Sequence, residues 1–347
     1  MAAPNLLHLL PMTRKSWIAA LIAVLVLAGL AGGWALWWHE AAGRFATSID
    51  LWIAARRAEG YKIEAQRDPI GGFPFRLRTR IAAPTAAAGD GSWSWSGPDL
   101  AIDAPAWSPL DIAFAMPGAH QVQARGHHYE VEAKTAEGLL SLATDGRLDR
   151  FRLTAGGISA QEPDKPAATI ESLYATVSQP APDPAAAIAA SLAFDLGAEN
   201  VTMPPDPRLA LGPKLDHLAT SGRLEGPLPR GFDAASLAAW RDAGGAVDLD
   251  LVGLAWGPLR LTGSGTFALD DQLRPLAAAN TSVQGTIETL QALADAGLMK
   301  PNDAQLAALG LALLSDGQGR VKLPLTAQDG ELRSGPLKLA KLAPVVR

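Results

Sequence analysis

Few side chains in this 347-residue sequence stand at spacings that support catalysis or metal binding. The chain has six histidines and no cysteine, which excludes disulfides, thiolate ligands and cysteine nucleophiles. His127 and His128 are adjacent, and on a strand they would face opposite sides, which disfavours a shared metal. No HExxH, GxSxG or GxxxxGK(S/T) motif is present. The sequence therefore predicts no catalytic residue, no metal and no cofactor, and we expect a protein that is not an enzyme.

Two further patterns each have a chemical and a structural interpretation. Asp248 and Asp250 share one strand face and could hold a cation, but a solvated sheet face is the favoured interpretation. The glycines of the Gly-Ser-Gly sequence at 263–265 resemble part of a dinucleotide loop. Its flanks indicate strands on both sides, whereas a phosphate site needs a helix N-terminus, so we reject a nucleotide site.

Three arginines, Arg76, Arg78 and Arg80, alternate with other residues along one predicted strand. Three guanidinium groups on one strand face could contact anionic lipid headgroups near a membrane. The favoured alternative is a solvated face on which the arginines pair with acidic neighbours.

Apolar side chains on other predicted strands suggest a ligand site of a different kind. The candidate residues are Trp93, Trp95, Leu110, Ile112, Phe114 and Met116. If they line a curved groove, lipid acyl chains could lie there, because a long sheet must cover its apolar face with something. A closed sandwich core built from the same residues is an equally open alternative.

The uncharged apolar run 17–38 is predicted to cross a membrane. As a helix its 22 residues would span about 33 Å, enough for the hydrocarbon core of a bilayer. Arg14 and Lys15 precede the run, so the positive-inside rule predicts a cytoplasmic N-terminus, 1–16, and a periplasmic location for the remainder. The alternative is a cleaved signal peptide, whose apolar region is shorter, about 7–15 residues. We expect an uncleaved, single-pass anchor in a bacterial inner membrane.

The spacing of apolar residues changes after the anchor, and this change predicts the secondary structure of the rest of the chain. Residues 39–60 are predicted as a juxtamembrane helix, because Phe45, Ile49 and Trp52 recur at helical spacing and Gly60 follows as a stop. Beyond Gly60, apolar and polar residues alternate in short runs separated by Gly, Pro and Asp, which is typical of antiparallel strands. Helices are predicted at 233–243, 286–297 and 302–314, the last two forming a hairpin over 286–314.

The predicted fold is mainly β with helical additions. It consists of an extended or curved antiparallel meander sheet, open as a groove or half-barrel or closed as a sandwich, with the C-terminal helical hairpin and one transmembrane helix before it. A stretch at 179–187 rich in Pro, Ala and Asp is predicted to separate two β-rich parts, 61–180 and 188–347. The two parts need not be independent, because one long sheet can cross that point.

Several segments in a fixed order resemble a bacterial family catalogued as domain of unknown function 2125. They are GFPFRL at 72–77, AWRDAGG at 239–245, WGPL at 256–259, GSGTFALD at 263–270, and GRVKLPLTAQDG with SGPLKL within 319–339. The resemblance covers about residues 40–345 and implies an envelope location and no established activity. The chain is also similar, more loosely, to large AsmA-like envelope proteins, whose β-rich grooves are associated with lipids.

The shared motifs are interpreted as architecture. The residues concerned are Gly72, Phe73, Pro74, Phe75, Trp240, Gly244 and Gly245. Gly72 permits a tight entry into a strand, and Pro74 fixes one backbone dihedral before it. Gly244 and Gly245 end a helix and let the chain turn into the next strand.

These observations together predict an inner-membrane-anchored periplasmic protein that binds lipid in a sheet groove or supports envelope biogenesis. The alternative is a scaffold subunit whose envelope protein partner covers exposed sheet edges. The net charge is -5 and the 30 basic residues are dispersed, so we expect no nucleic-acid partner.

Overall fold

A computed structural model describes most of the chain. The described ranges are 14–124, 126–180, 189–206, 208–229 and 231–346. Most of the predicted cytoplasmic segment 1–16 and most of the predicted linker 179–187 lie outside these ranges.

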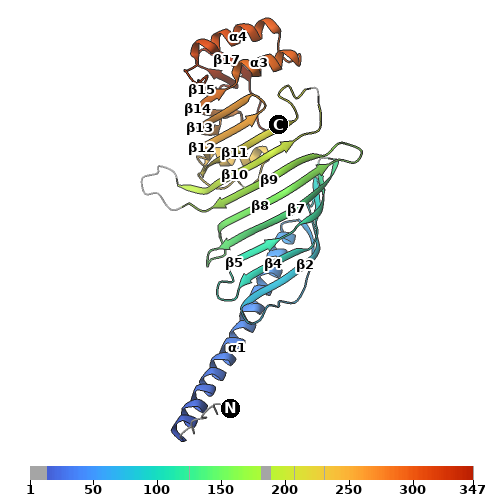
Figure 1. Ribbon diagram of the computed structural model, residues 1–347, viewed down its shortest axis with the longest axis vertical. Helices are drawn as coiled ribbons and strands as arrows, with labels where there is room; N and C mark the ends of the chain where they lie inside the picture. Colours follow the sequence, from blue (N-terminus) through green and yellow to red (C-terminus); the bar gives the residue numbers. More distant parts are fainter. Residues whose placement is uncertain (1–13, 125, 181–188, 207, 230, 347) are drawn as a thin grey trace, which may run out of the picture.

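One uninterrupted helix, α1 (Arg14–Ala58), contains both the apolar run and the predicted juxtamembrane helix. Its N-terminal part projects alone from the rest of the molecule (Figure 1). The apolar side chains there are exposed all round, and Leu21, Leu27 and Leu30 are each at least 60% exposed. A helix that is apolar on every side is stable only where its surroundings are apolar too. α1 is the only described helix long and apolar enough to cross a membrane.

Seventeen strands form one sheet in the described part of the chain. They are β1 (Lys62–Arg67), β2 (Arg76–Ala87), β3 (Trp93–Ser96), β4 (Leu100–Pro105), β5 (Asp111–Ala115), β6 (Gly118–Ala124), β7 (His127–Leu142), β8 (Leu148–Gln161), β9 (Ala168–Ser178), β10 (Ala190–Thr202), β11 (Lys214–Glu225), β12 (Ala246–Trp256), β13 (Leu259–Leu269), β14 (Pro275–Gln284), β15 (Val321–Gln328), β16 (Glu331–Ser334) and β17 (Leu337–Lys341). From β7 to β17, each strand pairs antiparallel with the next one in sequence. This order confirms the predicted antiparallel meander.

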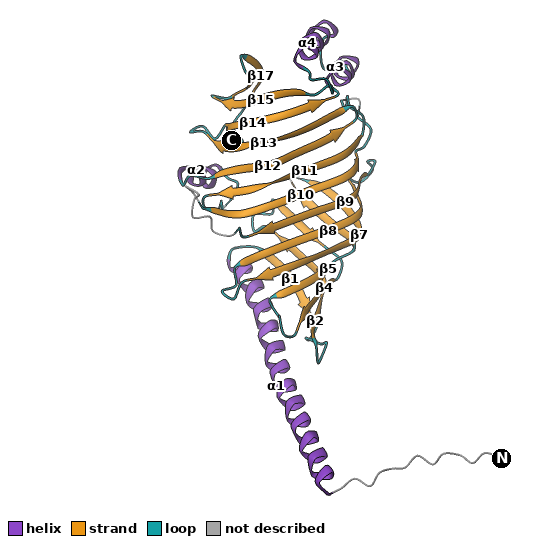
Figure 2. Cartoon of the chain, turned by 60° about the vertical axis from the view of Figure 1, so that its left-hand side comes forward, coloured by secondary structure: helices purple, strands orange, loops and turns teal. Residues whose placement is uncertain are grey.

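The sheet bends strongly between β2 and β7. Two pairs of short strands share this interval: β3 with β6 connects one half of β2 to β7, and β4 with β5 connects the other half. As a result β2, β4 and β5 lie behind β7 and β8, beside the end of α1 (Figure 2). The sheet thus curls around the C-terminal half of α1 and opens out beyond it.

The sheet also continues across the predicted linker. β9 and β10 lie on either side of that segment and pair along most of their length, from Ser178 opposite Ala193 to Thr169 opposite Thr202. The two β-rich parts are therefore joined in a single sheet.

Three shorter helices follow the predicted pattern. α2 (Ala234–Asp242) begins at Asp233, whose carboxylate accepts the backbone N–H of Ser236 at 2.9 Å. α3 (Thr286–Asp295) and α4 (Pro301–Leu314) form the C-terminal hairpin, and proline occupies the first turn of α4. This hairpin lies at the end of the sheet farthest from the projecting part of α1 (Figure 1).

Two clusters contain most of the large buried side chains, while smaller ones such as Ala198, Val283 and Val321 are buried elsewhere along the sheet. The proximal cluster joins Trp38, Ala42 and Phe45 of α1 to Leu77 of β2 and to Ala104 and Ala106. The distal cluster joins Leu237 and Trp240 of α2 to Leu269 of β13. The accessible surface is 22342 Å², whereas a compact monomer of 36.2 kDa would expose about 13,000 Å². The chain is therefore an extended sheet with a core at two places.

Candidate functional site

The register of the strands collects apolar side chains on one face of the sheet. Leu173 of β9 lies opposite Ala198 of β10, which lies opposite Leu218 of β11 and then Leu254 of β12. Directly paired residues of neighbouring strands point to the same side. The complete row, from β7 to β15, is Ala136, Ala155, Leu173, Ala198, Leu218, Leu254, Leu261, Val283 and Val321. We call it the long row, and the side of the sheet that carries it the apolar face.

Two further rows run beside the long row on the apolar face. One contains Gly138, Leu153, Ala175, Leu196 and Thr220, and the other contains Leu140, Phe151, Val177, Phe194 and Gly222. The opposite face is polar: Arg152, Thr176 and Asp195 lie opposite one another on β8, β9 and β10. The sheet therefore has one apolar side and one polar side over its whole middle part.

Helices cover the apolar face near its two ends. α1 covers it at β2, β4 and β5, and α2 covers it on β12, on β13 and at Leu224 near the end of β11. The α3–α4 hairpin contacts β13 and β15, where Val283 and Val321 of the long row are buried. Neither cluster contains a residue of β7, β8, β9 or β10. Leu196 and Leu218, in the uncovered stretch, are 38% and 45% exposed. Among the described residues, the middle of the apolar face thus has no covering layer.

The predicted groove residues lie at the curled end of the apolar face. Phe114 pairs with Ile102 and Gly138, and its ring stacks on Phe151 with the ring centres 5.9 Å apart. The ring fills the space above Gly138, where a Cβ atom would lie 2.2 Å from Phe114 Cζ. Ile112 packs against the proximal cluster.

The other four candidates lie on β3 or next to the ends of β5. Trp95 lies opposite Val122 of β6, which is itself opposite Tyr129 of β7. Trp93 is near Tyr61, with the ring centres 6.2 Å apart. Leu110 and Met116 flank β5, and their backbones are hydrogen-bonded to β7. The structure thus brings Ile112 and Phe114 onto the apolar face, while Trp93 and Trp95 lie on β3, between β2 and β6.

Sequence reasoning missed much of the uncovered stretch, including Leu153, Leu173 and Leu218. A signal was present in β8, where Phe151 and Leu153 alternate with Arg150 and Arg152. β9 offered a weaker signal, because alanine, threonine and serine occupy most of the strand. β11 did too, because its leucines do not alternate with polar residues.

The arginine row lies on the polar face and is paired with carboxylates. Arg76 and Arg78 donate to Asp103 at 2.6 and 2.9 Å, while Arg80 contacts Asp68 and Asp99 at 3.2 and 2.8 Å. Burial works to raise the pKa of Asp103, but the hydrogen bonds from the two arginines outweigh it and the pKa is lowered. Three guanidinium groups and three carboxylates balance in charge. The geometry favours the interpretation of a solvated, ion-paired strand.

The remaining candidates for chemistry are also occupied by local partners. Asp248 and Asp250 face Arg223 at 3.2 and 3.6 Å. His127 lies 3.4 Å from Glu162. The Gly-Ser-Gly sequence lies inside β13. Over the described ranges, no three His, Asp or Glu side chains come together as a metal site.

The two shared motifs have clear structural roles. Gly72 has a φ of +98°, and a Cβ atom there would lie 2.7 Å from the Arg76 carbonyl oxygen. The peptide bond between Phe73 and Pro74 is cis. Gly244 has a φ of +79° just after α2, and the indole of Trp240 lies where a Cβ atom on Gly245 would project, at 2.2 Å.

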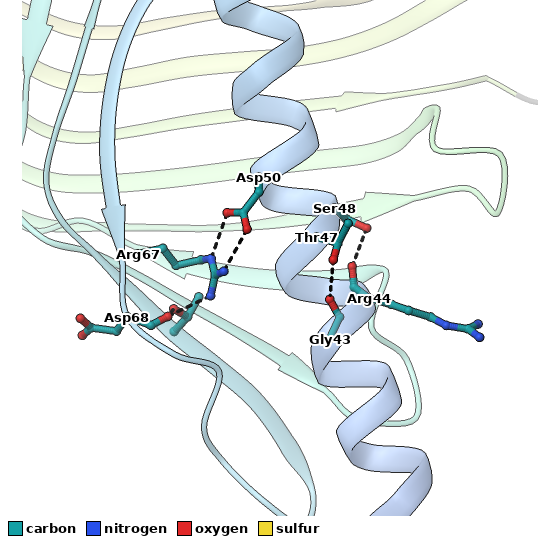
Figure 3. Close-up of polar contacts among 8 residues, drawn as sticks. Gly43, Arg44, Thr47, Ser48, Asp50, Arg67 and Asp68 are labelled. Carbon is teal, nitrogen blue, oxygen red and sulfur yellow. Dashed lines mark hydrogen bonds and ion pairs between the residues drawn. The ribbon is translucent and has the colours of Figure 1, made fainter.

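α1 is fastened to the sheet by specific contacts. The indole N–H groups of Trp34 and Trp38 donate to the carbonyl oxygens of Pro74 and Arg76, at 2.9 and 3.0 Å. Farther along the helix, Arg67 of β1 reaches the carboxylate of Asp50 at 3.1 Å (Figure 3). The helix is thus held to the curled sheet at several turns along its length.

Comparison with known proteins gives a family match without a function. Residues 37–343 match the model of a family described as an uncharacterised protein conserved in bacteria (DUF2125). No curated protein and no solved structure matches the chain. The matched range begins inside α1 and includes the sheet and all three shorter helices.

Proposed function

The chain belongs to the DUF2125 family of uncharacterised bacterial proteins, and from its geometry we propose a membrane-anchored envelope protein that holds lipid acyl chains on its apolar face. The single observation that carries the proposal is the uncovered stretch of that face between β7 and β11. In this proposal α1 crosses the inner membrane and the sheet stands in the periplasm, because Arg14 and Lys15 precede the apolar run. No covalent step is involved.

The packing of α1 supports a permanent anchor over a cleaved signal peptide. Trp38, Ala42 and Phe45 are among the most buried side chains of the chain, each less than 8% exposed. Cleavage after the apolar run would remove Trp38 and with it part of the proximal cluster. Because the folded core includes Trp38, cleavage at that point would destabilise the protein, which supports an uncleaved anchor.

The size of the uncovered stretch supports a ligand. Three rows across the five strands β7 to β11 make fifteen positions, twelve of them with apolar side chains, over about 500 Å² of sheet at the usual strand and residue spacings. The largest contiguous apolar patch on a typical soluble monomer is about 300–600 Å², and such a patch is often a functional site. A ligand that covers this patch would be stabilised by about 25 cal/mol for each Å² of apolar surface removed from water.

The chemistry of the face favours acyl chains over a peptide. A peptide laid on the middle of the apolar face would bury backbone N–H and C=O groups opposite side chains that offer no partner. An acyl chain has no such groups. The uncovered stretch crosses the five strands β7 to β11 and measures about 19 Å at about 4.8 Å per strand. A chain that fills one leaflet of a bilayer spans about 15 Å, so the stretch is long enough for one such chain laid across the strands.

The proposal is tested by the lipid that remains with the purified full-length protein. Protein extracted from membranes in a mild detergent is analysed for bound lipid by solvent extraction and mass spectrometry. The test variants are Leu196→Glu and Leu218→Glu, which place a charge on the apolar face. The control is Leu139→Glu, because Leu139 is similarly exposed, at 43%, but lies opposite Arg152 on the polar face.

We expect the wild type and the control to retain the same amount of lipid per protein, and the two test variants to lose most of it. Lipid that merely surrounds α1 would be equal in all four proteins. Equal lipid in all four would therefore contradict the proposal, as would a wild type without lipid.

A second candidate function is supported at the distal edge. β17 pairs with β16 alone in the described chain, and its Leu337 and Leu339 are 62% and 46% exposed. An unpaired edge strand can accept a strand from another protein. A photo-crosslinker at Leu337 that captured one protein in living cells, with no lipid on the apolar face, would favour this scaffold function.

A further inference from the structure

Four exposed aromatic side chains come from segments that meet where the sheet joins α1. They come from three segments: Trp37 from α1, Phe73 and Phe75 from the loop before β2, and Trp107 from the turn after β4. Their side chains are between 42% and 62% exposed. We call them the aromatic collar.

Hydrogen bonds fix the three segments against one another. Trp34 and Trp38 donate their indole N–H groups to the carbonyl oxygens of Pro74 and Arg76, and the ring of Phe73 meets Trp38 edge-on with the ring centres 5.5 Å apart. The Ala106 N–H donates to the carbonyl oxygen of Phe75 at 2.9 Å. The collar therefore sits at the level of the helix turn that contains Trp34 and Trp38.

The depth of that turn in a bilayer follows from helix geometry. About 20 helical residues span the roughly 30 Å hydrocarbon core, so a crossing that starts at Trp17 ends near Leu36. Leu36 lies between the two tryptophans that hold the loop. The collar is thus level with the boundary between acyl chains and headgroups, where aromatic side chains are preferentially found.

We propose that the aromatic collar inserts into the headgroup–acyl boundary of the bilayer that α1 crosses. In this arrangement the sheet contacts the membrane surface directly and is not held there by the helix alone. This inference rests on the anchor in the proposed function and is independent of lipid on the apolar face. The bilayer is the occupant because the anchor holds the collar at this depth in every molecule.

The absence of cysteine makes the test direct, because each introduced cysteine is unique. Full-length Phe73→Cys, Phe75→Cys and Trp107→Cys are labelled with an environment-sensitive fluorophore and reconstituted into phosphatidylcholine vesicles. Nitroxide-labelled phosphatidylcholine then serves as the quencher. Leu25→Cys, inside the apolar run, is the inserted control, and Leu139→Cys, on the polar face, is the aqueous control.

We expect the three collar labels to emit at shorter wavelength than the Leu139 label and to lose most of their emission to the nitroxide lipid. Water-like, unquenched emission at the collar with a quenched Leu25 label would overturn the inference and leave the anchor intact. Blue-shifted emission without quenching would indicate contact with protein and would also overturn it. Failure of the Leu25 label to be quenched would overturn the anchor and the collar together.

Discussion

At the scale of single residues, Trp38 connects the anchor to the fold. Its side chain is 4% exposed in the proximal cluster, and its indole N–H donates a hydrogen bond to the Arg76 carbonyl oxygen. One residue thus contributes both apolar packing and a directional hydrogen bond to the position of the helix. The two contributions can be separated by substitution.

Trp38→Ala is expected to destabilise the fold by about 3–5 kcal/mol, because it leaves a cavity in the proximal cluster. Trp38→Phe keeps much of the packing and loses the hydrogen bond, so we expect a smaller loss that includes about 1 kcal/mol for that bond. Thermal unfolding of the β circular-dichroism signal in detergent micelles measures both. Equal midpoints for wild type and Trp38→Ala would show that α1 is not part of the folded unit.

His120 provides a pH-dependent contribution. It lies opposite Val131 and stacks on Trp95 with ring centres 6.2 Å apart, and burial lowers its pKa below 6.5. The unfolded chain therefore takes up this proton more readily than the folded chain. The stability associated with neutral His120 is fully present above pH 6.5 and is lost as the pH falls through the lowered pKa.

We therefore expect the wild type to lose more stability than His120→Gln when the pH is lowered from 7.5 to about 5, since glutamine does not titrate. Unfolding midpoints of both proteins at the two pH values give the comparison. Parallel losses in the two proteins would assign the pH dependence to other groups.

At the scale of elements, glycines provide space for aromatic rings. Phe114 covers Gly138 within the sheet, and Trp240 of α2 covers Gly245 at the start of the next strand. In both places a Cβ atom would collide with a ring. The packing of α2 on the sheet thus depends on a residue outside the helix.

Gly245→Ala is expected to displace the Trp240 indole and destabilise the fold by about 1–3 kcal/mol, the usual cost of overpacking. Gly310→Ala is the matched control: Gly310 lies inside α4 and nothing lies within 4 Å of its Cβ position. There alanine should stabilise the helix by up to about 1 kcal/mol. The opposite signs can be read from the unfolding midpoints, and a neutral Gly245→Ala would contradict the packing role of Trp240.

The elements differ in how well the sequence predicts them. β2 and β12 could be predicted, because charged residues separate their apolar ones. β14 could not, because its sequence PLAAANTSVQ has few large apolar residues and becomes a strand through pairing with β13 and β15. α2 was predictable from its Asp233 cap, and the helical hairpin from its leucine spacing and from Pro301.

The candidate site was less predictable than the fold. Alternation showed that Ile112 and Phe114 share a face, but it could not show which part of that face is uncovered. That depends on where α1 and α2 pack, which is decided by long-range contacts such as those of Trp38 with β2 and Trp240 with β13. Local patterns contain no information about such contacts.

At the scale of the whole molecule, the anchor and the sheet form one folded unit. The contacts of α1 with the sheet begin at Trp34 and include the buried Trp38, Ala42, Phe45 and Ile53. The part of the helix before Trp34 contributes nothing to the described core. The boundary of the folded unit is therefore inside α1, near the end of the part proposed to cross the membrane.

Two truncated chains test this boundary. A chain that begins at Trp34 retains the proximal cluster and should unfold at nearly the same temperature as the full-length protein. A chain that begins at Gly43 loses Trp38 and Ala42 and should unfold at a clearly lower temperature or fail to fold. Similar midpoints for the two chains would contradict the boundary and would again allow a cleaved signal peptide.

The consecutive pairing of β7 to β17 has a consequence for how such a chain can change in length. From β8 to β16 each strand is bonded only to its predecessor and its successor, so removal of a complete hairpin leaves two strand ends that still run in opposite directions. Loss of a single strand would leave parallel neighbours. Loss of a single residue would move every later side chain of that strand to the opposite face of the sheet. The molecule is therefore tolerant of shortening or growth by whole hairpins and intolerant of a change by one amino acid.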